Sequence, residues 1–186
     1  FVVAAAQLNP LCLYLSPVAL AVVLGYSYAK RFTAAAHLVL GLSLAIAPVG
    51  AWVAVTGAFA LAPVLLGLAV VFWVAGFDVI YSLQDEEFDR REGLRSIPAR
   101  FGAPRALQIA RLFHGATLVL FYAVFLAVDG GWLFGGAVVV AGAFLVRQHR
   151  LVSPGDLTRV DAAFFTANGW LSVAFLLLGA ADVLLR

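Results

Sequence analysis

Residues 62–81 read APVLLGLAVVFWVAGFDVIY and run directly into SLQDEEFD, the charged segment at residues 82–89. About twenty mostly apolar residues are enough for one helix to cross the hydrocarbon core of a bilayer. Asp78 lies inside this apolar run, where an ionisable side chain is costly and therefore indicates a functional site by default. The stretch therefore predicts a transmembrane helix that carries a functional carboxylate near one membrane surface.

The composition of the whole chain agrees with a membrane environment. Apolar residues make up 64% of the 186 residues, charged residues make up 12%, and the mean hydropathy is +1.02. A soluble domain is roughly half apolar and one quarter charged. We therefore expect membrane lipid to cover the outside of the fold.

Five further apolar stretches complete a predicted set of six spanning helices. They cover residues 11–28, 36–55, 106–128, 132–146 and 162–185. A shorter apolar run, Phe1 to Leu8, has no preceding methionine and no basic flank, so we interpret it as the end of a helix whose beginning is missing. The prediction is an all-α transmembrane bundle, one N-terminally truncated domain over residues 1–186, with six full helices and part of a seventh.

The basic residues predict the orientation of the bundle. Eleven of the twelve Lys and Arg residues lie in or beside alternate loops, and only Arg186 lies on the other side. The positive-inside rule places such loops in the cytoplasm. We therefore predict a multi-pass protein of the cell inner membrane with an active site that faces the cytoplasm. The chain lacks the interleaved aromatic and basic pattern of nucleic-acid-binding proteins, so no nucleic-acid partner is expected.

The spacing of Asp78, Asp85 and Asp89 predicts a stripe of carboxylates. At 3.6 residues per turn, these positions fall within roughly 40° of one helix face. Oxygen ligands without a nearby Cys or His favour a hard cation such as Mg²⁺, which commonly binds one or two carboxylates together with substrate phosphates. Arginines that follow the stripe would hold phosphate oxygens by charge-assisted hydrogen bonds. The alternative is a solvated charged loop, which leaves Asp78 unexplained.

Tyr26 and Lys30 form an i, i+4 pair at a helix end on the same membrane face. Taken alone, this pair fits an interfacial tyrosine anchor and a lysine that obeys the positive-inside rule. Its meaning therefore depends on the other motifs in the chain.

Together, these segments resemble the UbiA superfamily of membrane prenyltransferases, in its 4-hydroxybenzoate polyprenyltransferase-like branch. DVIYSLQDEEFD at residues 78–89 matches the second aspartate-rich motif, DxxYxxxDxxxD, and YSYAK at residues 26–30 matches the YxxxK motif. RFT at residues 31–33, GLRSIP at residues 93–98 and FG at residues 101–102 resemble the same branch.

The resemblance implies nine helices and two aspartate-rich motifs that hold Mg²⁺ against a prenyl diphosphate. Carried over by position, Asp85 and Asp89 are the implied metal ligands and Asp78 lines the same cavity, so all three are candidate catalytic residues. The side chains implied to bind the diphosphate are Tyr26, Lys30, Arg91 and Arg95. The first motif, NDxxDxxxD, does not occur in this sequence, so we expect this stretch alone to be inactive.

The implied reaction transfers a polyprenyl group from an allylic diphosphate to an aromatic carboxylate such as 4-hydroxybenzoate, in the biosynthesis of ubiquinone. A dihydroxynaphthoate, for menaquinone, is the alternative acceptor. Metal and cationic side chains would stabilise the leaving diphosphate, and a dry aromatic chamber would protect the allylic cation from water. Candidates for the chamber wall are Phe72, Trp73, Phe77 and Tyr81, a stripe that also fits plain helix packing.

Two other protein classes compete with this interpretation. CDP-alcohol phosphotransferases also use membrane aspartates and Mg²⁺, but their DG…AR…G…D…D pattern is absent from the sequence. A cation-coupled transporter would carry its carboxylates near the membrane midplane, within inverted repeats. Here the acidic residues gather at one cytoplasmic loop and no repeat is visible, which favours the enzyme.

Overall fold

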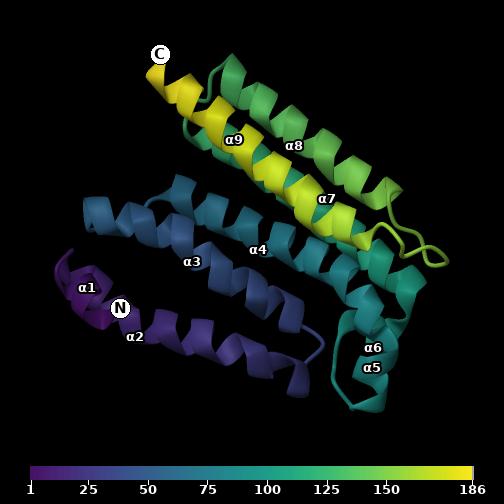
Figure 1. Ribbon diagram of the computed structural model, residues 1–186. Helices are drawn as coiled ribbons and strands as arrows, with labels where there is room; N and C mark the ends of the chain where they lie inside the picture. Colours follow the sequence, from purple (N-terminus) through teal and green to yellow (C-terminus); the bar gives the residue numbers. More distant parts are fainter. Residues whose placement is uncertain (186) are drawn as a thin grey trace.

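The computed structural model describes residues 1–185, which form a bundle of helices (Figure 1). Its α-helices are α1 (Val2–Ala6), α2 (Pro10–Gly25), α3 (Ala36–Thr56), α4 (Leu61–Tyr81), α5 (Glu86–Arg91), α6 (Ile97–Phe101), α7 (Ala103–Ala127), α8 (Trp132–Arg150) and α9 (Ala167–Leu184). Two 3₁₀ helices cover Tyr26–Arg31 and Ser82–Asp85, and a π-helix at Ala162–Thr166 leads into α9.

The described residues contain six helices that are long and apolar enough to cross a membrane. This confirms the predicted all-α fold, the six spanning helices and the multi-pass membrane character. The observed bounds differ from the predicted ones by several residues, since α2 ends at Gly25, α7 begins at Ala103 and α8 continues to Arg150. Basic side chains in the last turn of α8 face the negative end of the helix dipole, which favours this extension.

Local sequence explains where several helices begin and end. Asn9 caps α2, because its side-chain oxygen accepts a hydrogen bond from the Cys12 amide at 3.0 Å, and Pro10 follows at the first helical position. The Asn9 amide group also donates to the Val53 carbonyl at 2.8 Å, which ties the start of α2 to the end of α3. α3 ends at Thr56 and is followed by Gly57, whose φ of +70° is the left-handed conformation that glycine adopts without strain.

α4 lies between α3 and α7 and makes extensive contacts with both (Figure 1). Small residues allow the close approach of α3: a Cβ atom placed on Gly41 would overlap the carbonyl oxygen of Val71. On the α7 side, Ala69, Ala106 and Ala110 are fully buried. Small residues at such interfaces let backbones approach closely, which supplies the van der Waals contact that holds membrane helices together.

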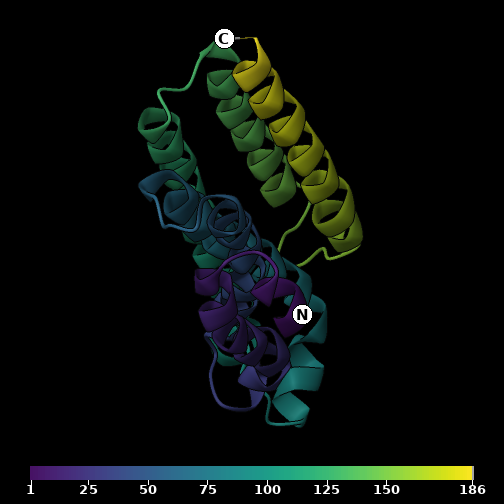
Figure 2. The same cartoon turned by 90° about the vertical axis from the view of Figure 1, so that its left-hand side faces the viewer.

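α8 and α9 lie side by side in both views of the molecule (Figures 1 and 2). Asp182 of α9 joins their ends, because its carboxylate accepts hydrogen bonds from the amides of Gly131 and Phe134 at 2.9 and 3.1 Å. These amides belong to the first turn of α8, where helix N–H groups lack partners within the helix. A residue of α9 therefore caps α8.

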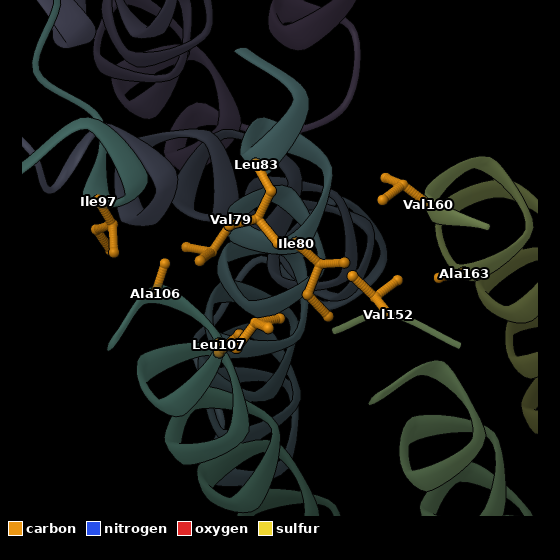
Figure 3. Close-up of a cluster of buried hydrophobic side chains, with 10 residues drawn as sticks. Val79, Ile80, Leu83, Ile97, Ala106, Leu107, Val152, Val160 and Ala163 are labelled. Carbon is orange, nitrogen blue, oxygen red and sulfur yellow. The ribbon is translucent and has the colours of Figure 1, made fainter. Parts of the chain in front are cut away.

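An apolar cluster anchors the charged end of α4 to the rest of the bundle. Val79, Ile80 and Leu83 pack with side chains of α6, α7, the segment that follows α8, and the π-helix (Figure 3). The remaining members of the cluster are Ile97, Ala106, Leu107, Ala110, Val152, Val160 and Ala163. The cluster holds the backbone on both sides of Ser82 in place, next to the predicted acidic motif.

Candidate active site

Asp78 is held near the charged end of α4 by a histidine of the neighbouring helix. Its Oδ2 atom lies 2.6 Å from Nδ1 of His37, a residue of the first turn of α3 whose side chain is fully buried. The Asp78 side chain itself is 20% exposed. The intramembrane carboxylate thus has a polar partner, as the cost of burying an unpaired charge requires.

The predicted stripe of three carboxylates on one regular helix face is wrong. α4 ends at Tyr81, and the next four residues form a 3₁₀ turn before α5 begins at Glu86. The Ser82 hydroxyl donates to the Val79 carbonyl at 3.0 Å, a local bond that competes with regular helix hydrogen bonding. Because a 3₁₀ helix has three residues per turn, the angular relation of Asp85 and Asp89 to Asp78 no longer follows the 3.6-residue period.

Asp89 is buried and paired with Lys30. The Lys30 ammonium lies 3.3 Å from Asp89 Oδ2, and the exposed fractions of the two side chains are 30% and 2%. These residues are separated by 59 positions in the sequence. The ion pair therefore joins the two segments that sequence analysis singled out independently, the YxxxK segment and the aspartate segment.

Backbone contacts reinforce this junction. The Arg95 amide donates to the Lys30 carbonyl at 2.7 Å, and the Arg95 guanidinium donates through Nη1 to the Phe32 carbonyl at 2.8 Å. The Leu94 amide donates to the Asp89 carbonyl at 2.8 Å, which turns the chain back after α5. Residues 30–32 and 89–95 are thus fastened together through main-chain and side-chain bonds.

Three of the other predicted site residues do not share these bonds. Asp85, Arg91 and Tyr26 are exposed, and no hydrogen bond or ion pair links their side chains to Asp78 or Asp89 within residues 1–185. The 3₁₀ geometry of Tyr26–Arg31 also rotates Tyr26 away from the helix face that an α-helical i, i+4 pair would share with Lys30. Lys30, Arg95 and Asp89 form the contacts at this junction.

Two cavities lie near these elements. One, about 490 Å³, is lined by the arginines Arg90, Arg95 and Arg100 together with Gly93, Leu94 and Ala99. The other, about 710 Å³, lies among α2, α3 and α4 and has apolar walls that include Val22, Leu42, Ile46 and Val71. Arg95 lines the first cavity, and the other predicted site residues line neither of the two.

The aromatic residues predicted to wall a chamber divide into two groups. Trp73 contacts Phe77, and both Phe77 and Tyr81 contact Phe164 of the π-helix, with ring centroids 4.4–5.8 Å apart. Phe72 packs instead against Phe113 of α7. Three of the four predicted rings therefore belong to one aromatic cluster, to which the π-helix adds Phe164.

Sequence reasoning missed His37, although the rule that identified Asp78 applies to it. His37 is an ionisable residue at the start of an apolar span, and such residues in membrane helices are rare and functional by default. His114 and His149 show the same signal in α7 and α8. Nδ1 of His114 lies 2.9 Å from Nε2 of His149. Nε2 of His114 lies 3.3 Å from the Trp73 carbonyl oxygen.

The chain is similar to several known proteins. A family model described as the UbiA prenyltransferase family matches residues 1–178. A 4-hydroxybenzoate octaprenyltransferase from Francisella tularensis is 28% identical over 179 residues, which cover 96% of this chain and 61% of that protein. A 4-hydroxybenzoate solanesyltransferase from Synechocystis sp. is 31% identical over 176 residues, which cover 92% and 60%.

A solved structure has the same fold. The apo structure of a UbiA homolog from Aeropyrum pernix K1 aligns with a TM-score of 0.82 and 34% sequence identity, over 99% of this chain and 67% of that one. The chain thus spans less than two thirds of the length of both curated relatives named above.

Proposed function

The chain belongs to the UbiA prenyltransferase family, and we propose on this premise that the complete protein transfers a polyprenyl group from an allylic diphosphate to an aromatic acid in quinone biosynthesis. Both curated relatives are named for action on 4-hydroxybenzoate, which favours this acceptor over a dihydroxynaphthoate. Residues 1–186 would form one prenyltransferase domain, embedded in the inner membrane with its charged end in the cytoplasm.

The observation that carries the proposal is the ion pair between Lys30 and Asp89. Two segments far apart in the sequence, each of which resembles a substrate-binding motif of the family, meet through this pair and through Arg95. A buried carboxylate and an ammonium at one junction can hold the two opposite charges of a metal diphosphate. We assign diphosphate binding to Lys30 and Arg95, with Tyr26 and Arg91 as further contacts.

The residues present suit a hard divalent cation. Asp85 and Asp89 offer carboxylate oxygens, the donors that Mg²⁺ prefers, and substrate phosphates complete its shell in many enzymes. Asp89 already holds a cation, because the Lys30 ammonium lies against its buried carboxylate. No group of three or more His, Cys, Asp or Glu residues within the described chain is arranged to bind a metal.

The protein groups would act in distinct ways during transfer. When bound, Mg²⁺ supplies positive charge that stabilises the departing diphosphate. Lys30 and Arg95 would add charge-assisted hydrogen bonds to the same oxygens, where negative charge develops as the carbon–oxygen bond breaks. The rings of Trp73, Phe77 and Tyr81 would exclude water from the allylic cation and face it with negative π-density.

The test compares acidic residues of the same segment in the complete protein as its gene encodes it. We expect Asp85→Ala and Asp89→Ala each to abolish Mg²⁺-dependent transfer from a labelled prenyl diphosphate to 4-hydroxybenzoate. Glu87→Ala removes an exposed carboxylate, and Glu86→Ala removes one that pairs with Arg90 at 2.8 Å. Both controls should retain most of the activity.

Equal losses at all four positions would mean that the segment acts only through its total charge, and the metal assignment would then be abandoned. A panel of aromatic acceptors in the same assay tests the substrate class. Transfer to a dihydroxynaphthoate but not to 4-hydroxybenzoate would move the protein to menaquinone biosynthesis.

A further inference from the structure

His37 makes two hydrogen bonds that together define its protonation. The Ile97 backbone amide donates to Nε2 at 3.2 Å. Since this nitrogen accepts a hydrogen bond, it carries the lone pair and the ring proton resides on Nδ1. Nδ1 faces Asp78 Oδ2 at 2.6 Å and donates to it. The imidazole is therefore neutral, and Oδ2 of Asp78 accepts its hydrogen bond.

The His37 ring is held in place by residues of three helices. His37 belongs to the first turn of α3, Asp78 to α4, and Ile97 begins α6. The amide of Ile97 is positioned by the α6 cap, in which the Ser96 hydroxyl accepts a hydrogen bond from the Ala99 amide at 3.2 Å. The His37 side chain is fully buried, so water does not compete for either bond.

Only one of the two carboxyl oxygens of Asp78 bonds to His37. His37 occupies Oδ2, whereas Oδ1 accepts no hydrogen bond from the described residues. The side chain is 20% exposed, which leaves room for a ligand to approach. The N-terminus of α3 also lies beside this carboxylate, and the positive end of a helix dipole favours negative charge there.

We propose that His37 is a positioning residue that holds the Asp78 side chain in one orientation, with Oδ1 available to the substrate. This role rests on the proposed function, in which Asp78 belongs to the prenyl-transfer site. The bond from Nδ1–H to a carboxylate corresponds to the way in which neighbouring groups orient catalytic side chains in many enzymes. His37 itself does not touch the reacting atoms.

Kinetics of the complete protein test the proposal with three substitutions at one position. His37→Asn places an amide donor where Nδ1–H stands, and we expect kcat for transfer within about threefold of the native value. His37→Gln places its amide at the Nε2 position, and His37→Ala has no side-chain donor. Both should lower kcat about 10- to 100-fold, as expected for a lost hydrogen bond to a charged group. KM for the prenyl diphosphate should stay unchanged, because Lys30 and Asp89 remain paired.

Ser43→Ala is the matched control, since Ser43 lies in the same helix and its hydroxyl donates to the Val39 carbonyl at 3.0 Å. It should change neither kcat nor KM. A bond that serves stability alone would lower the thermal unfolding temperature of all three His37 variants without distinguishing Asn from Gln in kcat. Equal kcat values for Asn and Gln would therefore overturn the proposal.

A spectroscopic measurement separates this inference from the proposed function. In ¹⁵N spectra of histidine-labelled protein in lipid, we expect His37, identified by its loss in His37→Asn, to show a protonated Nδ1 and an unprotonated Nε2. A doubly protonated ring or a proton on Nε2 would refute the positioning role even in an active enzyme. Absence of any prenyl transfer by the native protein would instead refute the proposed function and leave the assigned tautomer standing.

Discussion

Two buried histidines contact opposite faces of α4, and their different partners give them different chemistry. On the α3 face, His37 donates from Nδ1 to the carboxylate of Asp78. On the α7 face, Nε2 of His114 donates to the Trp73 carbonyl, so Nδ1 of His114 accepts from Nε2 of His149. The His114 ring also lies against Gly76 of α4. At about 100° per residue, positions 76 and 78 of a helix point in nearly opposite directions, which places the two contacts on opposite sides.

The two faces also differ in what they leave unsatisfied. On the α3 face, His37 contacts one carboxyl group, that of Asp78, near the charged end of the bundle. The α7 face links neutral groups, and Nδ1 of His149 is buried without a hydrogen-bond partner among residues 1–185. The nearest partners therefore give His37 and His114 different hydrogen bonds, although both residues lie in similar apolar spans.

Substituting a glycine at each of the two contacts, α3 with α4 and α4 with α7, tests the difference between them. The largest effect is expected at Gly41 of α3. A Cβ atom there would overlap the backbone of Val71, which cannot move without shifting α4. We expect Gly41→Ala to separate α3 from α4, to destabilise the protein by about 3 kcal/mol, and to lower kcat for prenyl transfer at least as much as His37→Ala does, because it breaks the contact between His37 and Asp78. Gly50→Ala is the control in the same helix, because a Cβ atom at Gly50 meets nothing within 4 Å.

Thermal unfolding in detergent and the transfer assay, applied to both variants, measure this effect. An active and stable Gly41→Ala variant would contradict the close packing of α3 on α4. Reduced activity in Gly50→Ala would show that an added methyl group in α3 lowers activity even where it meets no neighbour. The loss in Gly41→Ala could then not be assigned to the contact between α3 and α4.

A smaller effect is expected at the α7 face. A Cβ atom on Gly76 would overlap the His114 ring, which is a side chain and can yield. We expect Gly76→Ala to cost about 1–2 kcal/mol of stability and to change kcat for transfer by less than about threefold. His114→Ala in the same chain should restore part of the lost stability by making room for the methyl group.

A double-mutant cycle on unfolding temperatures measures this rescue. Additive losses in the double variant would contradict direct contact between position 76 and His114. Gly115→Ala, which adds a methyl group to α7 where no atom lies within 4 Å, is the control for α7.

The smallest effect is expected at an exposed site away from both histidines. In the loop after α8, the amide and hydroxyl of Thr158 donate to Asp156 at 3.0 and 2.6 Å. These bonds, chiefly that of the hydroxyl, lower the pKa of Asp156, with a smaller contribution from the nearby Arg159. A lowered folded-state pKa stabilises the protein above the unfolded-state pKa of about 4, and this contribution is lost as the pH falls through the folded-state value.

We therefore expect Asp156→Asn to lower the unfolding temperature slightly near neutral pH and not at all well below about pH 4. Unfolding curves of the native protein and the variant at both pH values measure the difference. A larger loss at acidic pH would have the wrong sign for a lowered pKa. The change in unfolding temperature at this exposed site is the reference for the larger changes expected at the two faces of α4.

Sequence patterns predicted some features of the candidate site and missed others. The apolar run with Asp78 and the charged segment after it indicated where α4 crosses the membrane and where its acidic end lies. The motif resemblance paired residues 26–30 with residues 78–89, and the contact of Lys30 with Asp89 joins these segments. The regular stripe of carboxylates was wrong, because the helix period was assumed to continue through Ser82–Asp85.

The sequence alone determined the spanning helices and the family, because hydropathy and short motifs are properties of contiguous residues. Only the tertiary structure decided the partners of the charged groups. His37 and Asp78 are 41 positions apart, and nothing local to either residue specifies the other. Their contact depends on how closely α3 approaches α4, which the missing side chain of Gly41 permits. A buried carboxylate takes its character from the atoms around it, and packing brings those atoms together.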